Sequence, residues 1–242
     1  MKRVLLIILT VINAIACEME SKLVSIDVIS SIDMYVGDSI VLEVSHSPSN
    51  ALVPAYHYRT SNRFVASVND QGAVICNHVG SCTIRVATAD TRFSSTCLIN
   101  VKPKNNLFCE PVLDFFITKT AVKLKEINST IDYENSKMLV FKDFNNPVQQ
   151  VAYQFDENQK LITSVVKIQA DVTSELTDFI NERYDIFPTP ESHNLLIWRG
   201  NDMEIVSKMV NKSCFVVYNP FSGKSTVESA ISTIEMIRYN CK

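Results

Sequence analysis

The chain has 242 residues, of which 46% are apolar and 20% charged, and its 23 Lys and Arg against 26 Asp and Glu give a formal net charge of −3. This composition is that of a folded protein with room for two ordinary domains, and it excludes an intrinsically disordered chain. The acidic balance argues against nucleic acid and against an anionic membrane face as partners.

Residues 1–16 have the three parts of a secretory signal peptide. A basic pair is followed by the apolar run 4–12 and by the small residues Ala14-Ile15-Ala16, directly before Cys17. The apolar run is too short to span a bilayer as a helix. This end resembles a bacterial lipobox, which implies that Cys17 becomes the first residue of the mature protein and carries acyl chains. The alternative is an ordinary secretory signal cleaved nearby. Residues 17–23 then form a short acidic tether.

Short runs of alternating apolar and polar residues follow over residues 24–103, separated by turn residues at intervals of about eight to twelve positions. Each run has one face for a core and one for solvent. The runs are 39–44, 64–68, 73–76, 82–86 and 97–101. The pattern predicts an all-β sandwich.

A characteristic spacing of turn and core residues runs through residues 24–102. Its segments are Tyr35-Val36-Gly37-Asp38, Leu42, Pro48, Asn50-Ala51, Tyr58-Arg59-Thr60-Ser61-Asn62, Val65-Ala66-Ser67-Val68, Gly72-Ala73-Val74, Gly80, Ile84 and Cys97-Leu98-Ile99-Asn100-Val101. Their order resembles the bacterial Ig-like domain, group 2, although Tyr58 stands where that family usually has tryptophan. The family's members are stalk, spacer and adhesion modules on bacterial surfaces, so the resemblance implies a spacer without catalytic function.

Three cysteines lie in this segment. Strand parity points Cys76, Cys82 and Cys97 toward the core, where a thiol behaves as a small hydrophobe. Cys82 and Cys97 fall on consecutive strands, so a disulfide between them is the alternative in an envelope compartment. No C-x-x-C pair occurs in the chain, which argues against a zinc or redox motif.

After a polar hinge at 102–106, residues 104–242 predict an α+β domain with a mostly antiparallel sheet and helices on one side. It consists of two helix-plus-three-strand units and a terminal helix. Expected helices are within 110–128, at 174–184 and at 226–239, and expected strands are 138–141, 148–155, 161–168, 194–198, 203–210 and 213–218. This element order resembles the β-lactamase inhibitor protein and small outer-membrane assembly lipoproteins, families that use an open sheet face for protein contacts.

Aromatic side chains supply the candidate recognition site. If one sheet face is exposed, the rings of Tyr153, Phe155, Trp198 and Tyr218 could form a platform for a glycan or a protein. The alternative is that they pack beneath the helices. The segment Gly223-Lys224-Ser225 resembles a phosphate-binding loop but lacks the leading glycine, so a turn into a capped helix explains it better.

The sequence contains no acid–base pair, nucleophile motif or metal-ligand cluster, and we therefore expect no enzyme activity, no cofactor and no metal site. It favours a lipid-anchored envelope protein of the bacterial outer membrane, with the Ig-like domain as spacer and a recognition or adhesion role at the cell surface. The ligand would be a protein or a glycan. The alternative is a periplasm-facing structural or assembly lipoprotein that binds envelope proteins.

Overall fold

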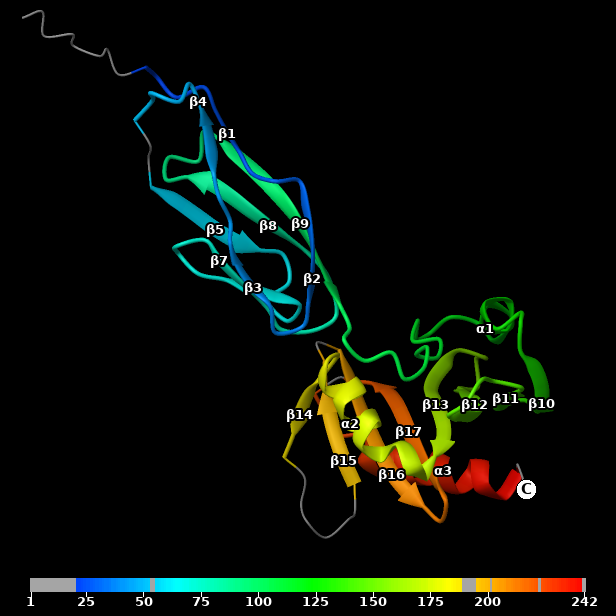
Figure 1. The fold of residues 1–242 in the computed structure, drawn as a ribbon. Helices are drawn as coiled ribbons and strands as arrows, with labels where there is room; N and C mark the ends of the chain where they lie inside the picture. The colour runs from blue at the N-terminus through cyan, green and yellow to red at the C-terminus, as the bar shows by residue number, and fades with distance from the viewer. Residues whose placement is uncertain (1–20, 53–54, 189–194, 201, 222, 241–242) are drawn as a thin grey trace, which may run out of the picture.

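The computed structural model describes residues 21–52, 55–188, 195–200, 202–221 and 223–240 (Figure 1). The expected signal peptide and Cys17 lie outside these residues. The described chain is mostly β-sheet. It forms an N-terminal sandwich, residues 21–102, and a C-terminal sheet domain, residues 104–240.

In the N-terminal sandwich, a four-stranded sheet (β2-β9-β8-β5), a three-stranded sheet (β3-β7-β6) and the pair β1-β4 enclose one core. Alternate residues such as Val74, Ile84 and Ile99 are fully buried in it. The alternating runs of the sequence therefore form strands as predicted. The strands are β1 (Ser25–Asp27), β2 (Ser31–Tyr35), β3 (Ser39–Val41), β4 (Ser45–Ser47), β5 (Tyr56–Thr60), β6 (Ala66–Val68), β7 (Ala73–Cys76), β8 (Gly80–Thr88) and β9 (Ser94–Lys102).

The aromatic ring of Tyr58 packs against this core and depends on a glycine opposite it. Gly72 has a φ of +77°, and a Cβ at this position would lie 2.8 Å from the ring carbon Cζ of Tyr58. Only glycine meets both the backbone angle and the close approach.

In the four-stranded sheet, β2 and β9 are the first and last strands along the chain, and they run in the same direction. β2 pairs with β9 in parallel, with Ser31 opposite Leu98 and Tyr35 opposite Lys102. The chain therefore enters the sandwich at one pole and leaves at the other, where the C-terminal sheet domain begins (Figure 1).

The C-terminal sheet domain is built on one eight-stranded antiparallel sheet in the order β10-β11-β12-β13-β17-β16-β15-β14. Two four-stranded meanders meet along β13 and β17. The strands are β10 (Thr130–Glu134), β11 (Met138–Lys142), β12 (Val148–Phe155), β13 (Leu161–Gln169), β14 (Asp185–Phe187), β15 (Leu195–Arg199), β16 (Met203–Val210) and β17 (Ser213–Pro220). The helices are α1 (Lys119–Lys125), η1 (Ala170–Val172), α2 (Thr173–Asn181) and α3 (Val227–Asn240).

Each repeated unit has four strands after its helix, one more than predicted. The additional strands, β10 and β14, are the two edges of the sheet, and almost all of their residues are exposed. Both strands are short, with five and three residues, and neither has a face that is buried in a core, so the sequence pattern missed both.

The helices lie on both faces of the sheet, so the expectation of helices on one side is wrong. Val122 of α1 and Phe179 of α2 belong to the core on one face, and α2 lies in front of the sheet in Figure 1. Ala230 and Ile234 of α3 belong to the core on the opposite face. The physical reason is that the central strands are apolar on both faces, and each face requires a cover. The open sheet face expected from the resemblance is covered by α3.

Candidate functional site

The four candidate aromatic side chains lie together in the core beneath α1 and α2 and do not form an exposed platform. Tyr153, Trp198 and Tyr218 are 0% exposed and Phe155 is 1% exposed. The recognition site predicted on these rings is therefore wrong, and the alternative, packing beneath the helices, is what the structure has.

Polar atoms on two of these rings are paired inside the core. The Tyr153 hydroxyl donates to the Glu126 carboxylate, which directly follows α1. The Trp198 indole Nε1 donates to Oδ1 of Asn181 at 2.8 Å, at the end of α2. Burial and the Glu126 carboxylate both raise the pKa of Tyr153, so this phenol stays neutral and remains a donor.

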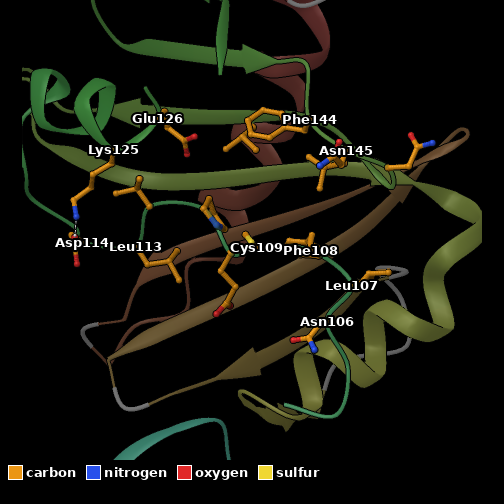
Figure 2. A pocket seen from close by; sticks show the side chains of 16 residues that line it. Asn106, Leu107, Phe108, Cys109, Leu113, Asp114, Lys125, Glu126, Phe144 and Asn145 are labelled. Atoms are coloured by element: carbon orange, nitrogen blue, oxygen red, sulfur yellow. Dashed lines mark ion pairs between the residues drawn. The ribbon is translucent and has the colours of Figure 1, made fainter. Parts of the chain in front are cut away.

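A groove of about 780 Å³ lies beside this aromatic core and is the candidate site (Figure 2). Its walls are the segment 106–114, the end of α1 and the connection between β11 and β12. The residues that line it are Asn106, Leu107, Phe108, Cys109, Glu110, Pro111, Val112, Leu113, Asp114, Lys125, Glu126, Phe144, Asn145, Asn146, Val148 and Val151.

The segment 106–114 is attached to the sheet through its middle. The Val112 amide donates to the Tyr153 hydroxyl at 3.0 Å, and the Val112 carbonyl accepts from Ser164 Oγ at 2.6 Å. The helix expected within 110–128 is α1, Lys119–Lys125, so the residues before it in that range are not helical. Pro111 and a φ of +65° at Phe116 do not suit a longer helix. The segment instead runs over the sheet as one wall of the groove.

The charged groups that line the groove have partners within the protein. Lys125 pairs with Asp114 at 2.9 Å, and Glu126 accepts from Tyr153 and from Ser129. Glu110 accepts from the Tyr184 hydroxyl at 2.9 Å, and burial raises the pKa of its carboxyl group. The groove therefore presents no isolated charge to a ligand.

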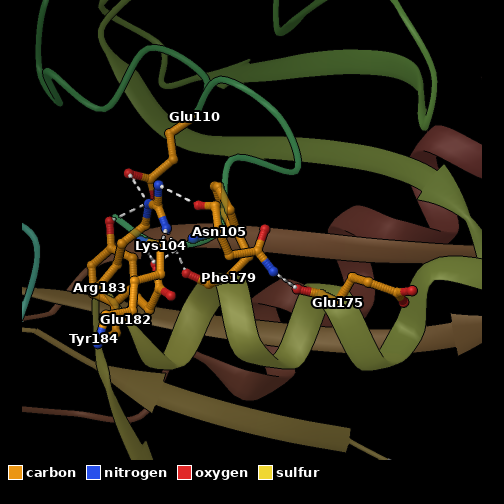
Figure 3. Close-up of polar contacts among 8 residues, drawn as sticks. All are labelled: Lys104, Asn105, Glu110, Glu175, Phe179, Glu182, Arg183 and Tyr184. Atoms are coloured by element: carbon orange, nitrogen blue, oxygen red, sulfur yellow. Dashed lines mark hydrogen bonds and ion pairs between the residues drawn. The ribbon is translucent and has the colours of Figure 1, made fainter. Parts of the chain in front are cut away.

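A polar joint between the two parts of the molecule holds the start of this wall (Figure 3). The Glu182 carboxylate accepts from the backbone amides of Lys104 at 2.9 Å and Asn105 at 3.0 Å. The Glu182 carbonyl accepts from the Val79 amide of the N-terminal sandwich at 2.8 Å. The Arg183 guanidinium donates to the carbonyl of Asn105 at 3.4 Å. The segment expected to be a hinge is thus bonded to the C-terminal sheet domain, and Glu182 also bonds that domain to the N-terminal sandwich.

His78 adds a second contact across the joint. Its ring stacks on Phe64 at 4.1 Å between centroids, its Nδ1 lies 2.9 Å from the Phe64 carbonyl oxygen, and its Nε2 lies 3.3 Å from Asp185 Oδ1. Residues from both parts of the chain therefore fix the position of β14.

The expected inward cysteines are buried free thiols. Cys82 lies opposite Ile99, and Cys97 lies opposite Ile84, so the two cysteines are diagonal neighbours on adjacent strands. This spacing is wider than a disulfide usually spans, and the disulfide considered from the sequence is not formed. Burial raises the pKa of Cys76 to about 11.

The turn before α3 is occupied by a carboxylate of the protein itself. Glu204 is 0% exposed, and its Oε1 accepts from the Thr226 amide at 2.6 Å. Its Oε2 accepts from Arg199 Nε at 2.9 Å and Nη2 at 2.8 Å. A phosphate would have to displace this group, so the structure gives the Gly223-Lys224-Ser225 turn a capping role.

Among the described residues, no group of three His, Cys, Asp or Glu side chains is placed to hold a metal ion. No helix within the same residues is long and apolar enough to cross a membrane.

No protein-family model matches the chain, and no curated protein matches it. Among solved structures, it is similar to the S-layer protein rSbsC(31-844), with a TM-score of 0.30 and 13% identity over 82% of this chain and 21% of that one. It is also similar to domains 5-6 of the S-layer protein SbsC, with a TM-score of 0.27 and 12% identity over 84% of this chain and 86% of that one. The chain spans about a fifth of the first protein's length. At these TM-scores the similarity supports neither a shared fold nor a shared function.

Proposed function

We propose that the protein is a non-enzymatic, lipid-anchored envelope protein of the bacterial outer membrane, in which an Ig-like spacer presents a recognition domain at the cell surface. The parallel pairing of β2 with β9 carries this proposal, because it sends the chain from an anchored N-terminal pole to an opposite pole that holds the C-terminal sheet domain. A spacer needs its anchored end and its presented domain at opposite poles.

The polar joint supports the same function. A connection that resists bending keeps a recognition domain at a fixed distance from the membrane. The Glu182 carboxylate and the His78 ring provide contacts on two sides of the connection. The groove begins directly after this joint and supplies the recognition surface in the proposal.

Anchoring is tested by the substitution Cys17→Ser in the full-length protein. The unchanged protein should partition into the detergent phase, because acyl chains contribute about 0.8 kcal/mol per buried methylene. The serine variant should partition into the aqueous phase. Equal partitioning of the two proteins would contradict the anchor.

Presentation at the surface is tested by protease treatment of intact cells. Loss of an epitope in the C-terminal sheet domain, with a periplasmic marker intact, is the expected result. Full protection would instead favour the periplasm-facing assembly lipoprotein.

A further inference from the structure

The polar side chains that remain free in the groove are neutral amides. Asn106 and Asn145 line it from two different segments (Figure 2), and neither side chain has a hydrogen-bond partner among the described residues. Asn146 accepts from Gln169 at 3.3 Å through Oδ1, which leaves its amide N–H groups for other partners. Each amide offers both donors and an acceptor.

The floor of the groove is apolar. Val148 and Val151 are 8% and 4% exposed, and the partly buried side chains of Phe108, Leu113 and Phe144 surround them. A ligand that fits must place an apolar face on this floor and direct polar groups to the rim.

Ionic ligands find no counter-charge here, since Lys125, Glu126 and Glu110 are each paired within the protein. A peptide added as a strand would need a regular backbone edge. The wall does not provide one, because the chain bends at Leu107 and Phe108.

We propose that this groove binds a neutral carbohydrate chain. A sugar ring has one apolar C–H face, and its hydroxyl groups donate and accept as the asparagine amides do. The volume of about 780 Å³ lies within the range of small-ligand sites, roughly 300–1,000 Å³. This inference rests on the proposed recognition function and names its ligand class.

The test uses the full-length protein in a detergent that contains no sugar. It is titrated by calorimetry with neutral hexasaccharides of glucose, mannose and N-acetylglucosamine, with an acidic hexagalacturonate and with a pool of neutral peptides. At least one neutral hexasaccharide should bind. Asn106→Ala and Asn145→Ala should each weaken that binding about 3- to 10-fold, the effect of losing one neutral hydrogen bond.

Cys109 provides a second readout, because its thiol is exposed on the groove wall. Bound sugar should slow its alkylation several-fold. Asn128→Ala is the matched control, since Asn128 is exposed near the end of α1 but does not line the groove.

Three results would overturn the inference: no binding of any neutral hexasaccharide, tighter binding of the acidic sugar or the peptides, or unchanged affinity in both groove variants. None of these results alters the outcomes of detergent partitioning or protease treatment, so failure of the ligand class is distinguishable from failure of the proposed function.

Discussion

Along β9 of the N-terminal sandwich, Cys97, Ile99 and Val101 are buried in alternation with more exposed residues, whereas along β17 of the C-terminal sheet domain six consecutive residues are buried. The first region buries one face of each sheet and leaves the other to solvent. The second places its sheet between two cores, and it also buries the Glu204 carboxylate, which pairs with the partly exposed Arg199. A sheet with a core on both faces can bury a helix-capping carboxylate, which a two-sheet sandwich would leave exposed to water. Such a sheet needs helices packed on both faces.

The largest expected effect is at Trp198, in the core under α2. Trp198→Ala should lower the free energy of unfolding by about 4 kcal/mol, because it removes a fully buried ring and leaves a cavity. Urea unfolding followed by circular dichroism measures it. Leu196→Ala on the same strand, at a side chain that is 36% exposed, is the control and should cost less than about 1 kcal/mol. Equal losses of stability in the two variants would show that the Trp198 side of β15 is not a buried core.

Glu204→Gln should lower the free energy of unfolding by about 3 kcal/mol, since it leaves Arg199 without its buried partner. The same denaturation experiment measures the loss. Glu228→Gln, at an exposed position in the first turn of α3, should change stability by less than about 0.5 kcal/mol. A loss in the control as large as at Glu204 would show that the buried Glu204 carboxylate contributes no more to stability than an exposed one.

Acid should destabilise the protein through the same residue. Burial alone would raise the pKa of Glu204, but hydrogen bonds from Thr226 and Arg199 outweigh burial and hold it below the ordinary 4.5. A carboxyl group with a lowered pKa in the folded state stabilises the fold above its unfolded pKa, and this contribution is lost as pH falls through the folded value. Stability measured between pH 7 and pH 3 should therefore fall less steeply in Glu204→Gln. Parallel curves for the two proteins would contradict this linkage.

Cys97→Ser should lower the stability of the N-terminal sandwich by about 2 kcal/mol, because it places a hydroxyl in an apolar core without an adequate partner. Trp198 is the single tryptophan of the chain, so its fluorescence reports the C-terminal sheet domain separately. Circular dichroism should reveal an early transition, while the fluorescence transition should not move. A shift of both transitions together would mean that the two regions unfold as one unit.

The smallest expected effect is at the joint. Glu182→Ala should accelerate hydrogen exchange at the Lys104 and Asn105 amides about tenfold, corresponding to one lost hydrogen bond to a charged acceptor at each amide. Glu175→Ala, with an exposed side chain on α2, should leave these rates unchanged. Unchanged rates in Glu182→Ala would mean that the carboxylate does not hold the connection in solution.

The same contrast explains what could be predicted from the sequence. The alternation of apolar and polar residues correctly predicted β7, β8 and β9. Successive side chains of a strand point to opposite faces, so in a sheet buried on one face every second residue is buried. In the C-terminal sheet domain, runs such as Met138-Leu139-Val140-Phe141 marked strands but carried no information about which face a helix would cover. For this reason the sequence left open whether the aromatic residues lay on an exposed face or beneath a helix.

Sequence patterns could not predict the groove. Its walls come from segments that are separated along the chain, and the segment 106–114 has no periodic structure. Pro111, near the start of the range 110–128, is a local signal that the chain there is not helical. Asn106 and Asn145 have no signature beyond that of ordinary loop residues.

The parallel pairing of β2 and β9 also determines how the protein carries mechanical load. If the N-terminal end is anchored and the C-terminal sheet domain is pulled outward, tension draws β2 toward one pole and β9 toward the other. The two strands would have to slide along each other, so the hydrogen bonds from Ser31–Leu98 to Tyr35–Lys102 share the tension instead of opening one after another. The sandwich is loaded in shear, the direction in which a sheet resists extension best.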